Sequence, residues 1–93
     1  MNEVLIMYVY MLECQDGSFY TGIAKNLEKR LSNHGQGSKY TRAKKPKKLV
    51  YVEIPENAHK REPQIKKLSR KQKKELIASP LNQITDYKHI VVD

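Results

Sequence analysis

The fold is decided by residues 8–23, which read Tyr-Val-Tyr-Met-Leu-Glu-Cys-Gln-Asp-Gly-Ser-Phe-Tyr-Thr-Gly-Ile. The run from Val4 to Cys14 is apolar at both odd and even positions, which predicts a β-strand covered on both of its faces. Asp16-Gly17 follows, and an Asp-Gly pair between two apolar runs is a strong hairpin signal. Residues 19–23 are predicted to be the returning strand, so the chain opens with an antiparallel hairpin.

The segment after the hairpin predicts one helix, one loop and one further strand. Asn26 can cap a helix whose apolar positions are Leu27 and Leu31, and Gly35 would end that helix near His34. Residues 35–48 are polar and basic, with breaks at a glycine and a proline, and this predicts a loop. Residues 49–54 (Leu-Val-Tyr-Val-Glu-Ile) predict the third strand.

Two helices are predicted in the second half. Residues 57–68 have helical character, but Pro63 stands among them. Either the helix kinks there, or its regular part begins near Glu62 with the proline in the first turn. Ser69 and Gln72 resemble a capping box for another helix that runs to about Ala78.

The predicted order of elements is β-β-α-β-α-α, followed by a C-terminal segment with a short strand at residues 89–92. Such an order is typical of an α+β fold, here a small antiparallel three-stranded sheet flanked by helices. At 93 residues we expect a single domain over residues 1–93, with its core at about residues 6–78 and residues 79–93 as a C-terminal extension.

Composition excludes several classes of protein. No apolar run approaches the length of a membrane span, and the start of the chain lacks the basic and small-residue features of a secretory signal. Cys14 is the only cysteine, so neither an internal disulfide nor a cysteine zinc cluster can form. A reducing cytoplasmic location fits these features best.

The positive charge is concentrated in one part of the sequence. The chain has a net charge of +8, and residues 39–74 alone hold 14 Lys and Arg against three glutamates. Such asymmetry indicates a polyanionic partner, because neutralised phosphates release counterions. A solvated lysine-rich face is the alternative. An anionic membrane is a weaker option, because the basic run lacks the apolar face of an interfacial helix.

Tyr10, Tyr20 and Arg30 follow one another at intervals of ten residues. The two tyrosines stand in the tripeptides Tyr8-Val9-Tyr10 and Tyr20-Thr21-Gly22. With this spacing, residues 6–78 resemble the GIY-YIG nuclease domain, and in particular the small stand-alone bacterial GIY-YIG proteins. Further segments that fit this group are Asp-Gly-Ser-Phe-Tyr-Thr-Gly-Ile, Lys-Tyr-Thr-Arg and Gln-Ile-Lys-Lys-Leu-Ser-Arg. The resemblance implies the fold predicted above and a phosphodiester hydrolase.

The resemblance also implies a set of catalytic residues. Tyr10 and Tyr20 match the two motif tyrosines, Arg30 the catalytic arginine, His34 a histidine one turn later, and Glu62 the glutamate that holds a single Mg²⁺ or Mn²⁺ ion. A lone carboxylate suits Mg²⁺, which keeps most of its water ligands, and an arginine fork suits a phosphate. A tyrosine with the ordinary pKa of about 10 would need a lowered pKa to act as a base. Several family members carry an asparagine after the glutamate, and we do not assign that role to Asn82.

A shared site requires both tyrosines on one face of the hairpin. A two-residue loop would place Tyr10 and Tyr20 on opposite faces, whereas an odd loop or a bulge places them together. We therefore expect an odd loop or a bulge. On the helix, Asn26, Arg30 and His34 recur every four residues and share one face.

We expect the basic loop to contact the nucleic-acid backbone, through Lys39, Tyr40, Arg42, Lys44, Lys45, Lys47 and Lys48. The preferred hypothesis is a metal-dependent endonuclease that acts on DNA in repair or recombination, alone or recruited by another protein. The alternative is a non-catalytic nucleic-acid-binding or adaptor domain that keeps the fold. Taken singly, each site residue also has a plain structural interpretation, such as a core tyrosine or an ion-pair partner of Lys66.

Overall fold

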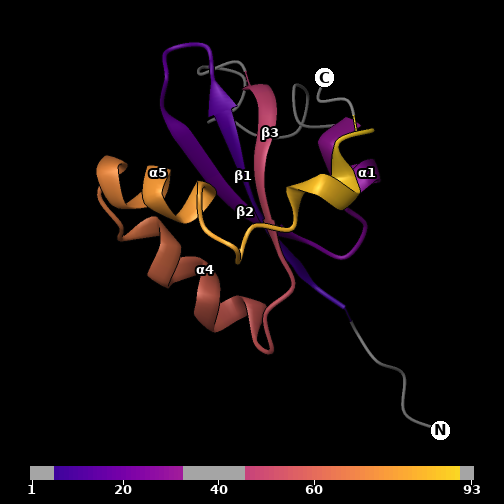
Figure 1. The fold of residues 1–93 in the computed structure, drawn as a ribbon. Coiled ribbons are helices and arrows are strands. Elements are labelled where there is room, and N and C mark those ends of the chain that lie inside the picture. Colours follow the sequence, from indigo (N-terminus) through magenta and orange to yellow (C-terminus); the bar gives the residue numbers. More distant parts are fainter. Residues whose placement is uncertain (1–5, 33–45, 91–93) are drawn as a thin grey trace, which may run out of the picture.

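The computed structural model describes residues 6–32 and 46–90, and their arrangement is shown in Figure 1. In chain order the elements are β1 (Tyr8–Cys14), β2 (Phe19–Ala24), α1 (Leu27–Ser32), β3 (Pro46–Glu53), α4 (Ala58–Lys66), α5 (Arg70–Ile77) and the 3₁₀ helix η1 (Ile84–Tyr87). The strands form one sheet in the order β2-β1-β3, with β1 antiparallel to both neighbours. The predicted α+β fold and its β-β-α-β-α-α order are therefore confirmed.

The hairpin between β1 and β2 has an odd loop. The amide of Cys14 donates to the carbonyl of Ser18 at 2.8 Å, and the amide of Gly17 donates to the carbonyl of Cys14 at 2.9 Å. Three residues thus lie between the paired ends, and Gly17 adopts a φ of 84°, as expected of the glycine in a three-residue hairpin loop. The register pairs Tyr10 with Gly22 and Leu12 with Tyr20, so the predicted odd loop is confirmed.

Both faces of the central strand are buried, as its continuous apolar run predicts. Tyr10 and Leu12 point to the face covered by α1 and η1, where Leu27 and Leu31 complete a cluster. Val9 and Met11 point to the opposite face, which α4 and α5 cover with Ile65 and other side chains. Figure 1 shows these two helical layers on opposite sides of the sheet. The protein therefore has two small cores, one on each face of the sheet.

Local capping signals account for where the helices begin. Asn26 accepts a hydrogen bond from the amide of Lys29 at 3.0 Å, which confirms it as the cap of α1. Ser69 and Gln72 exchange the two hydrogen bonds of a capping box at the start of α5, also as predicted. The predicted end of α1 near His34 lies outside the described residues.

Helix α4 settles the two alternatives at Pro63. The helix begins at Ala58, capped by the side chain of Asn57, and it continues through Pro63 to Lys66. A start near Glu62 was therefore the wrong alternative. Pro63 has no amide hydrogen for the carbonyl of His59, but the Asn57 cap and the burial of Ala58 and Ile65 hold the first turns in place.

Two boundaries predicted from sequence are wrong. The third strand starts at Pro46 rather than Leu49, because its first residues pair with the far end of β1. Residues 89–90 form no strand, and the segment before them is the 3₁₀ helix η1. The reason is Asn82, whose side chain binds the carbonyls of Val50 and Ile77 and the amides of Val52 and Ile84. These bonds hold the C-terminal segment beside β3 and turn it across the sheet.

None of the helices in the described part of the chain is long and apolar enough to cross a membrane.

Candidate functional site

The two motif tyrosines lie side by side on one face of the hairpin. Tyr10 is fully buried and Tyr20 is half-buried, with their ring centroids 6.4 Å apart and the rings tilted by 45°. They meet because Tyr10 pairs with Gly22, two residues beyond Tyr20, so side-chain alternation directs both rings to the same face. The pairing register thus brings together two residues ten positions apart.

Gly22 provides the room in which the Tyr10 ring lies. A Cβ atom placed at Gly22 would stand 2.6 Å from the Tyr10 hydroxyl oxygen, 2.7 Å from its Cζ and 3.1 Å from Cε1 of Tyr20. The first two separations are far below any normal carbon contact. The Tyr10 hydroxyl therefore lies directly over the glycine of the second motif, which explains why this position carries no side chain.

Arg30 joins the two tyrosines from α1. Its guanidinium group lies near enough to the hydroxyl groups of both Tyr10 and Tyr20 for side-chain hydrogen bonding to raise the pKa of Arg30. Contact with Tyr10 is the largest cause of a raised pKa for Arg30, so the side chain is positively charged at every relevant pH. Leu27 and Leu31 are buried on the same helix and fix its rotation, which directs Arg30 toward the sheet.

Tyr10 holds its proton strongly in this site. Burial raises the pKa of Tyr10 to about 12, and the neighbouring Tyr20 and Glu62 add to the increase. The hydrogen bond from Arg30 acts in the opposite direction but does not outweigh burial. At neutral pH the Tyr10 hydroxyl is therefore protonated. Burial thus moves the pKa of Tyr10 in the direction opposite to the one that a catalytic base would need.

Glu62 approaches the site from the other helical layer. It lies on α4, which packs against β2, the edge strand of the sheet, and its charge raises the pKa of Tyr10. The carboxylate forms an ion pair with Lys66 at 3.4 Å, one turn along the helix. Its side chain is only 22% exposed, whereas that of Lys66 is 55% exposed. Glu62 is therefore the ion-pair partner of Lys66, and its charge also acts on Tyr10.

The donor set around Glu62 suits a metal that keeps most of its water. The residues that the structure describes contain no group of three or more His, Cys, Asp or Glu side chains able to hold a metal. A single carboxylate with room for waters and a phosphate oxygen is compatible with Mg²⁺, but not with a closed zinc or calcium site. The lysine beside Glu62 would have to release the carboxylate when a cation bound.

Other predicted site residues fall outside this group or outside the described residues. His34, Lys39, Tyr40, Arg42, Lys44 and Lys45 belong to the part of the chain that the structure does not describe. Lys47 and Lys48 lie in β3 rather than in a loop, at the edge of the sheet opposite β2. Lys48 is exposed and pairs with Glu13 at 3.7 Å. The structure thus places Arg30 beside Tyr10 and Tyr20, with Glu62 near enough for its charge to raise the pKa of Tyr10, and Lys48 at the opposite edge of the sheet.

A second buried polar cluster, not predicted from sequence, lies on the face covered by α4. The Tyr51 hydroxyl donates to Glu53 at 2.5 Å, and Arg61 donates to both carboxylate oxygens at 2.8 and 3.1 Å. Glu53 is almost fully buried, so this bidentate pair compensates its desolvation. Tyr51 and Glu53 are two residues apart on one strand, a spacing that could have indicated their shared face. The cluster anchors α4 to β3.

Alkaline pH should destabilise the protein through Tyr10 and Tyr51. Burial is the main cause of the raised pKa of both, so the folded protein retains two protons that the unfolded chain releases above about pH 10. Their stabilising contribution is complete below pH 10 and declines as pH rises toward 12. The loss is about 1.4 kcal/mol per pH unit for each tyrosine.

Urea unfolding at several pH values, with absorbance of ionised tyrosine followed in parallel, checks this expectation. Tyr10→Phe and Tyr51→Phe should each remove about half of the additional pH slope. Equal slopes in both variants and the wild type would show that lysines, and not these tyrosines, cause the alkaline loss.

Comparison with known proteins agrees with the geometry. Residues 6–75 match the GIY-YIG catalytic domain. A UPF0213 protein of Clostridium perfringens is 56% identical over 77 residues, which cover 77% of this chain and 83% of that relative. A UPF0213 protein of Staphylococcus saprophyticus is 49% identical over 76 residues, which cover 76% of this chain and 93% of that relative. The solution NMR structure of a UPF0213 protein from Bacillus halodurans is similar, with a TM-score of 0.55, 33% identity and coverage of 95% of this chain and 99% of that one.

Proposed function

Because this chain belongs to the GIY-YIG catalytic-domain family, we propose that it is a metal-dependent endonuclease that hydrolyses phosphodiester bonds in DNA. One observation carries the proposal: Arg30 lies within hydrogen-bonding reach of the hydroxyl groups of both motif tyrosines. Glu62 supports it, because its negative charge is near enough to raise the pKa of Tyr10. A guanidinium fork, two hydroxyl groups and a carboxylate can together position a phosphate, a cation and an attacking water for phosphodiester hydrolysis.

Arg30 is the residue that meets the phosphate in this proposal. Its planar guanidinium has five donors, and the tyrosine contacts hold it in one orientation, with donors left for the phosphoryl oxygens. Negative charge on those oxygens increases as water attacks phosphorus and the bond to the leaving oxygen breaks. A preoriented cation stabilises that charge without reorganisation during the reaction.

The two tyrosines would have different roles. Tyr10 is fully buried and protonated at neutral pH, so it orients Arg30 and keeps the site's geometry. Tyr20 is half-buried and lines the surface beside β2, where substrate and water can reach it. This difference in burial favours Tyr20 over Tyr10 as the hydroxyl that meets the attacking water.

Glu62 would hold the cation, Mg²⁺ or Mn²⁺. When bound, such an ion polarises a phosphoryl oxygen and acidifies a coordinated water. The residues of this chain would supply the rest of the site. Glu62 would position the cation, Lys66 would move away from the carboxylate of Glu62, and Arg30 would orient the phosphate.

The proposed substrate is DNA because the chain is basic, with a net charge of +8. The basic segment predicted from sequence, Lys39 to Lys48, remains the proposed backbone contact. We further propose that the protein acts in DNA repair or recombination, with a recruiting protein as a partner, in the reducing cytoplasm.

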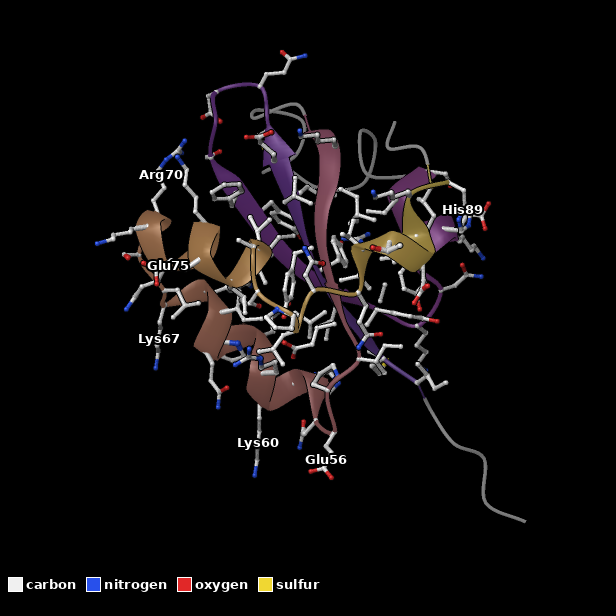
Figure 2. The ribbon with its side chains drawn as sticks, in the orientation of Figure 1. Glu56, Lys60, Lys67, Arg70, Glu75 and His89 are labelled. Carbon is white, nitrogen blue, oxygen red and sulfur yellow. The ribbon has the colours of Figure 1, made fainter. Side chains whose placement is uncertain are left out.

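Cleavage of supercoiled, single-stranded and branched DNA at low salt tests the proposal. We expect nicking that needs Mg²⁺ or Mn²⁺ and stops in EDTA. Arg30→Ala should lower the rate by about 10² to 10³, the effect of removing one donor to a developing oxyanion. The control Lys60→Ala removes the same charge from an exposed side chain that points away from the sheet in Figure 2, and it should leave the rate unchanged.

Intact DNA with every substrate and metal would overturn the nuclease. If wild type and Arg30→Ala then bind DNA with equal affinity, the chain is a non-catalytic binding or adaptor domain that keeps the fold.

A further inference from the structure

A groove lies at the outer edge of β2, between that strand and helices α4 and α5. It has a volume of about 230 Å³ and is lined by Phe19, Tyr20, Thr21, Lys66 and Lys73. Tyr20 is the residue that the groove shares with the candidate site formed by Tyr10, Tyr20 and Arg30. The groove therefore adjoins that site but is lined by different charged groups.

Thr21 contributes a polar atom that the described part of the protein does not satisfy. The residue is only 3% exposed, and its hydroxyl is buried without a hydrogen-bond partner among the described residues. Leaving such a donor unsatisfied costs about 1–3 kcal/mol. A buried hydroxyl of this kind needs an explanation, and a ligand that accepts its hydrogen bond is one.

The backbone of Thr21 is also directed toward this edge. In an antiparallel ladder, hydrogen-bonded pairs alternate with non-bonded pairs. The Cys14–Ser18 pair is hydrogen-bonded, so the alternation makes Leu12–Tyr20 and Tyr10–Gly22 bonded pairs and Met11–Thr21 a non-bonded one. The amide of Thr21 therefore points away from β1, toward the open edge where the groove lies.

Cations face this same edge from both helices. Lys66 of α4 and Lys73 of α5 both line the groove. Burial lowers the pKa of Lys73, and the positive charge of Lys66 lowers it further. Arg70 stacks over the ring of Phe19 at 5.5 Å and donates to the carbonyl of Gly17. Figure 2 shows Arg70 extending toward the hairpin. The acid beside them is Glu62, which pairs with Lys66.

We propose that this groove binds one phosphate group of a nucleic-acid strand, with Lys66 and Lys73 neutralising its charge and the Thr21 hydroxyl donating to an oxygen. Two ammonium groups lining one groove favour an anion as the ligand of the groove itself. A buried donor selects one with strong acceptor oxygens. The inference rests on the proposed function in one respect: the strand would be the one whose neighbouring phosphate lies at Arg30. The groove would thus set the position of the scissile bond.

Binding measured in EDTA tests the groove without any cleavage. Labelled protein is titrated with inorganic phosphate and with a short single-stranded oligonucleotide, and the amide signal of Thr21 is followed by NMR. Lys73→Gln should weaken oligonucleotide binding about fivefold and reduce its salt slope by about 0.7, one phosphate contact on a single strand. The control Lys67→Gln lies one residue from Lys66, points outward in Figure 2, and should change affinity less than twofold.

Thr21→Val separates a ligand role from a structural one. Valine has nearly the same shape without the hydroxyl, so the protein should remain equally or more stable while oligonucleotide binding weakens. Loss of stability with unchanged binding would assign the hydroxyl a structural role and overturn the inference.

Equal losses in Lys73→Gln and Lys67→Gln would also overturn it, because they would show only a diffuse charge effect. So would a Thr21 signal that moves with inorganic phosphate while Lys73→Gln leaves oligonucleotide affinity unchanged, since the groove would then take free phosphate. If the groove binds the oligonucleotide specifically but the protein cleaves no DNA, the proposed nuclease activity is contradicted and the phosphate site in the groove is not.

Discussion

Glu62→Gln should abolish metal-dependent DNA cleavage, with a loss of about 10³-fold or more, while the protein stays folded and binds DNA at least as tightly. Glutamine keeps the shape of the side chain but removes the charge that would hold the cation, and cation chemistry at a phosphoryl group contributes several kcal/mol to the barrier. The only ion pair lost among the described residues is the partly exposed one with Lys66, so the free energy of unfolding should change by less than about 1 kcal/mol.

The measurement combines initial cleavage rates with DNA affinity in EDTA and urea unfolding. Glu56→Gln is the matched control, because Glu56 is exposed, lies just before α4 and points outward in Figure 2. Cleavage by Glu62→Gln at the wild-type rate would remove Glu62 from the metal site. A further readout is the pKa of Tyr10, which should fall slightly in Glu62→Gln because the neighbouring negative charge is gone.

Gly22→Ala should remove most cleavage activity and destabilise the fold. The new methyl group would stand 2.6 Å from the Tyr10 hydroxyl oxygen and 2.7 Å from its Cζ, and the Tyr20 ring at 3.1 Å blocks escape on that side. Tyr10 is fully buried, so its ring can move only by displacing the core. Overpacking of this kind costs about 1–3 kcal/mol. A shift of about 1 Å in the group that orients Arg30 should lower the cleavage rate about 10²-fold.

Gly17→Ala separates lost stability from lost geometry. Gly17 has a φ of 84°, so alanine there should cost about 1 kcal/mol of backbone strain in the hairpin loop. That loop is remote from the ring of Tyr10, so cleavage per folded molecule should stay close to the wild-type rate. Urea unfolding gives the folded fraction for both variants. An active Gly22→Ala protein would show that the contact of Tyr10 with Arg30 is not needed for catalysis.

Local signals in the sequence determined most of the fold. The apolar run of β1, the Asp-Gly loop, the Asn26 cap and the Ser69–Gln72 capping box each depend on residues within a few positions of one another. The structure has every one of these features. The odd number of residues in the hairpin loop has a consequence beyond the loop. Because side chains alternate between the two faces of a strand, an odd loop places Tyr10 and Tyr20 on the same face.

The two failures at segment boundaries have a long-range cause. Residues 46–48 have the composition of a loop, but pairing with β1 makes them a strand. Residues 89–92 (His-Ile-Val-Val) have a mostly β-branched sequence that favours a strand, but the hydrogen bonds of Asn82 turn the chain before the described residues 89 and 90. In both cases a partner many residues away provides more stabilisation than the local preference, and a local pattern does not contain that partner.

By itself, the sequence determined which residue types form the candidate site and that two of them share a face. Only the tertiary structure decided that Arg30 lies beside the hydroxyl groups of both tyrosines, that the charge of Glu62 acts on Tyr10 from the α4 layer, and that Tyr10 keeps its proton. It also placed the Thr21 hydroxyl in a cationic groove without a partner among the described residues. The spacing of residues along a strand or helix determines which face of that element their side chains share. The burial of a side chain, its contacts with other elements and its pKa depend on how separate elements pack together.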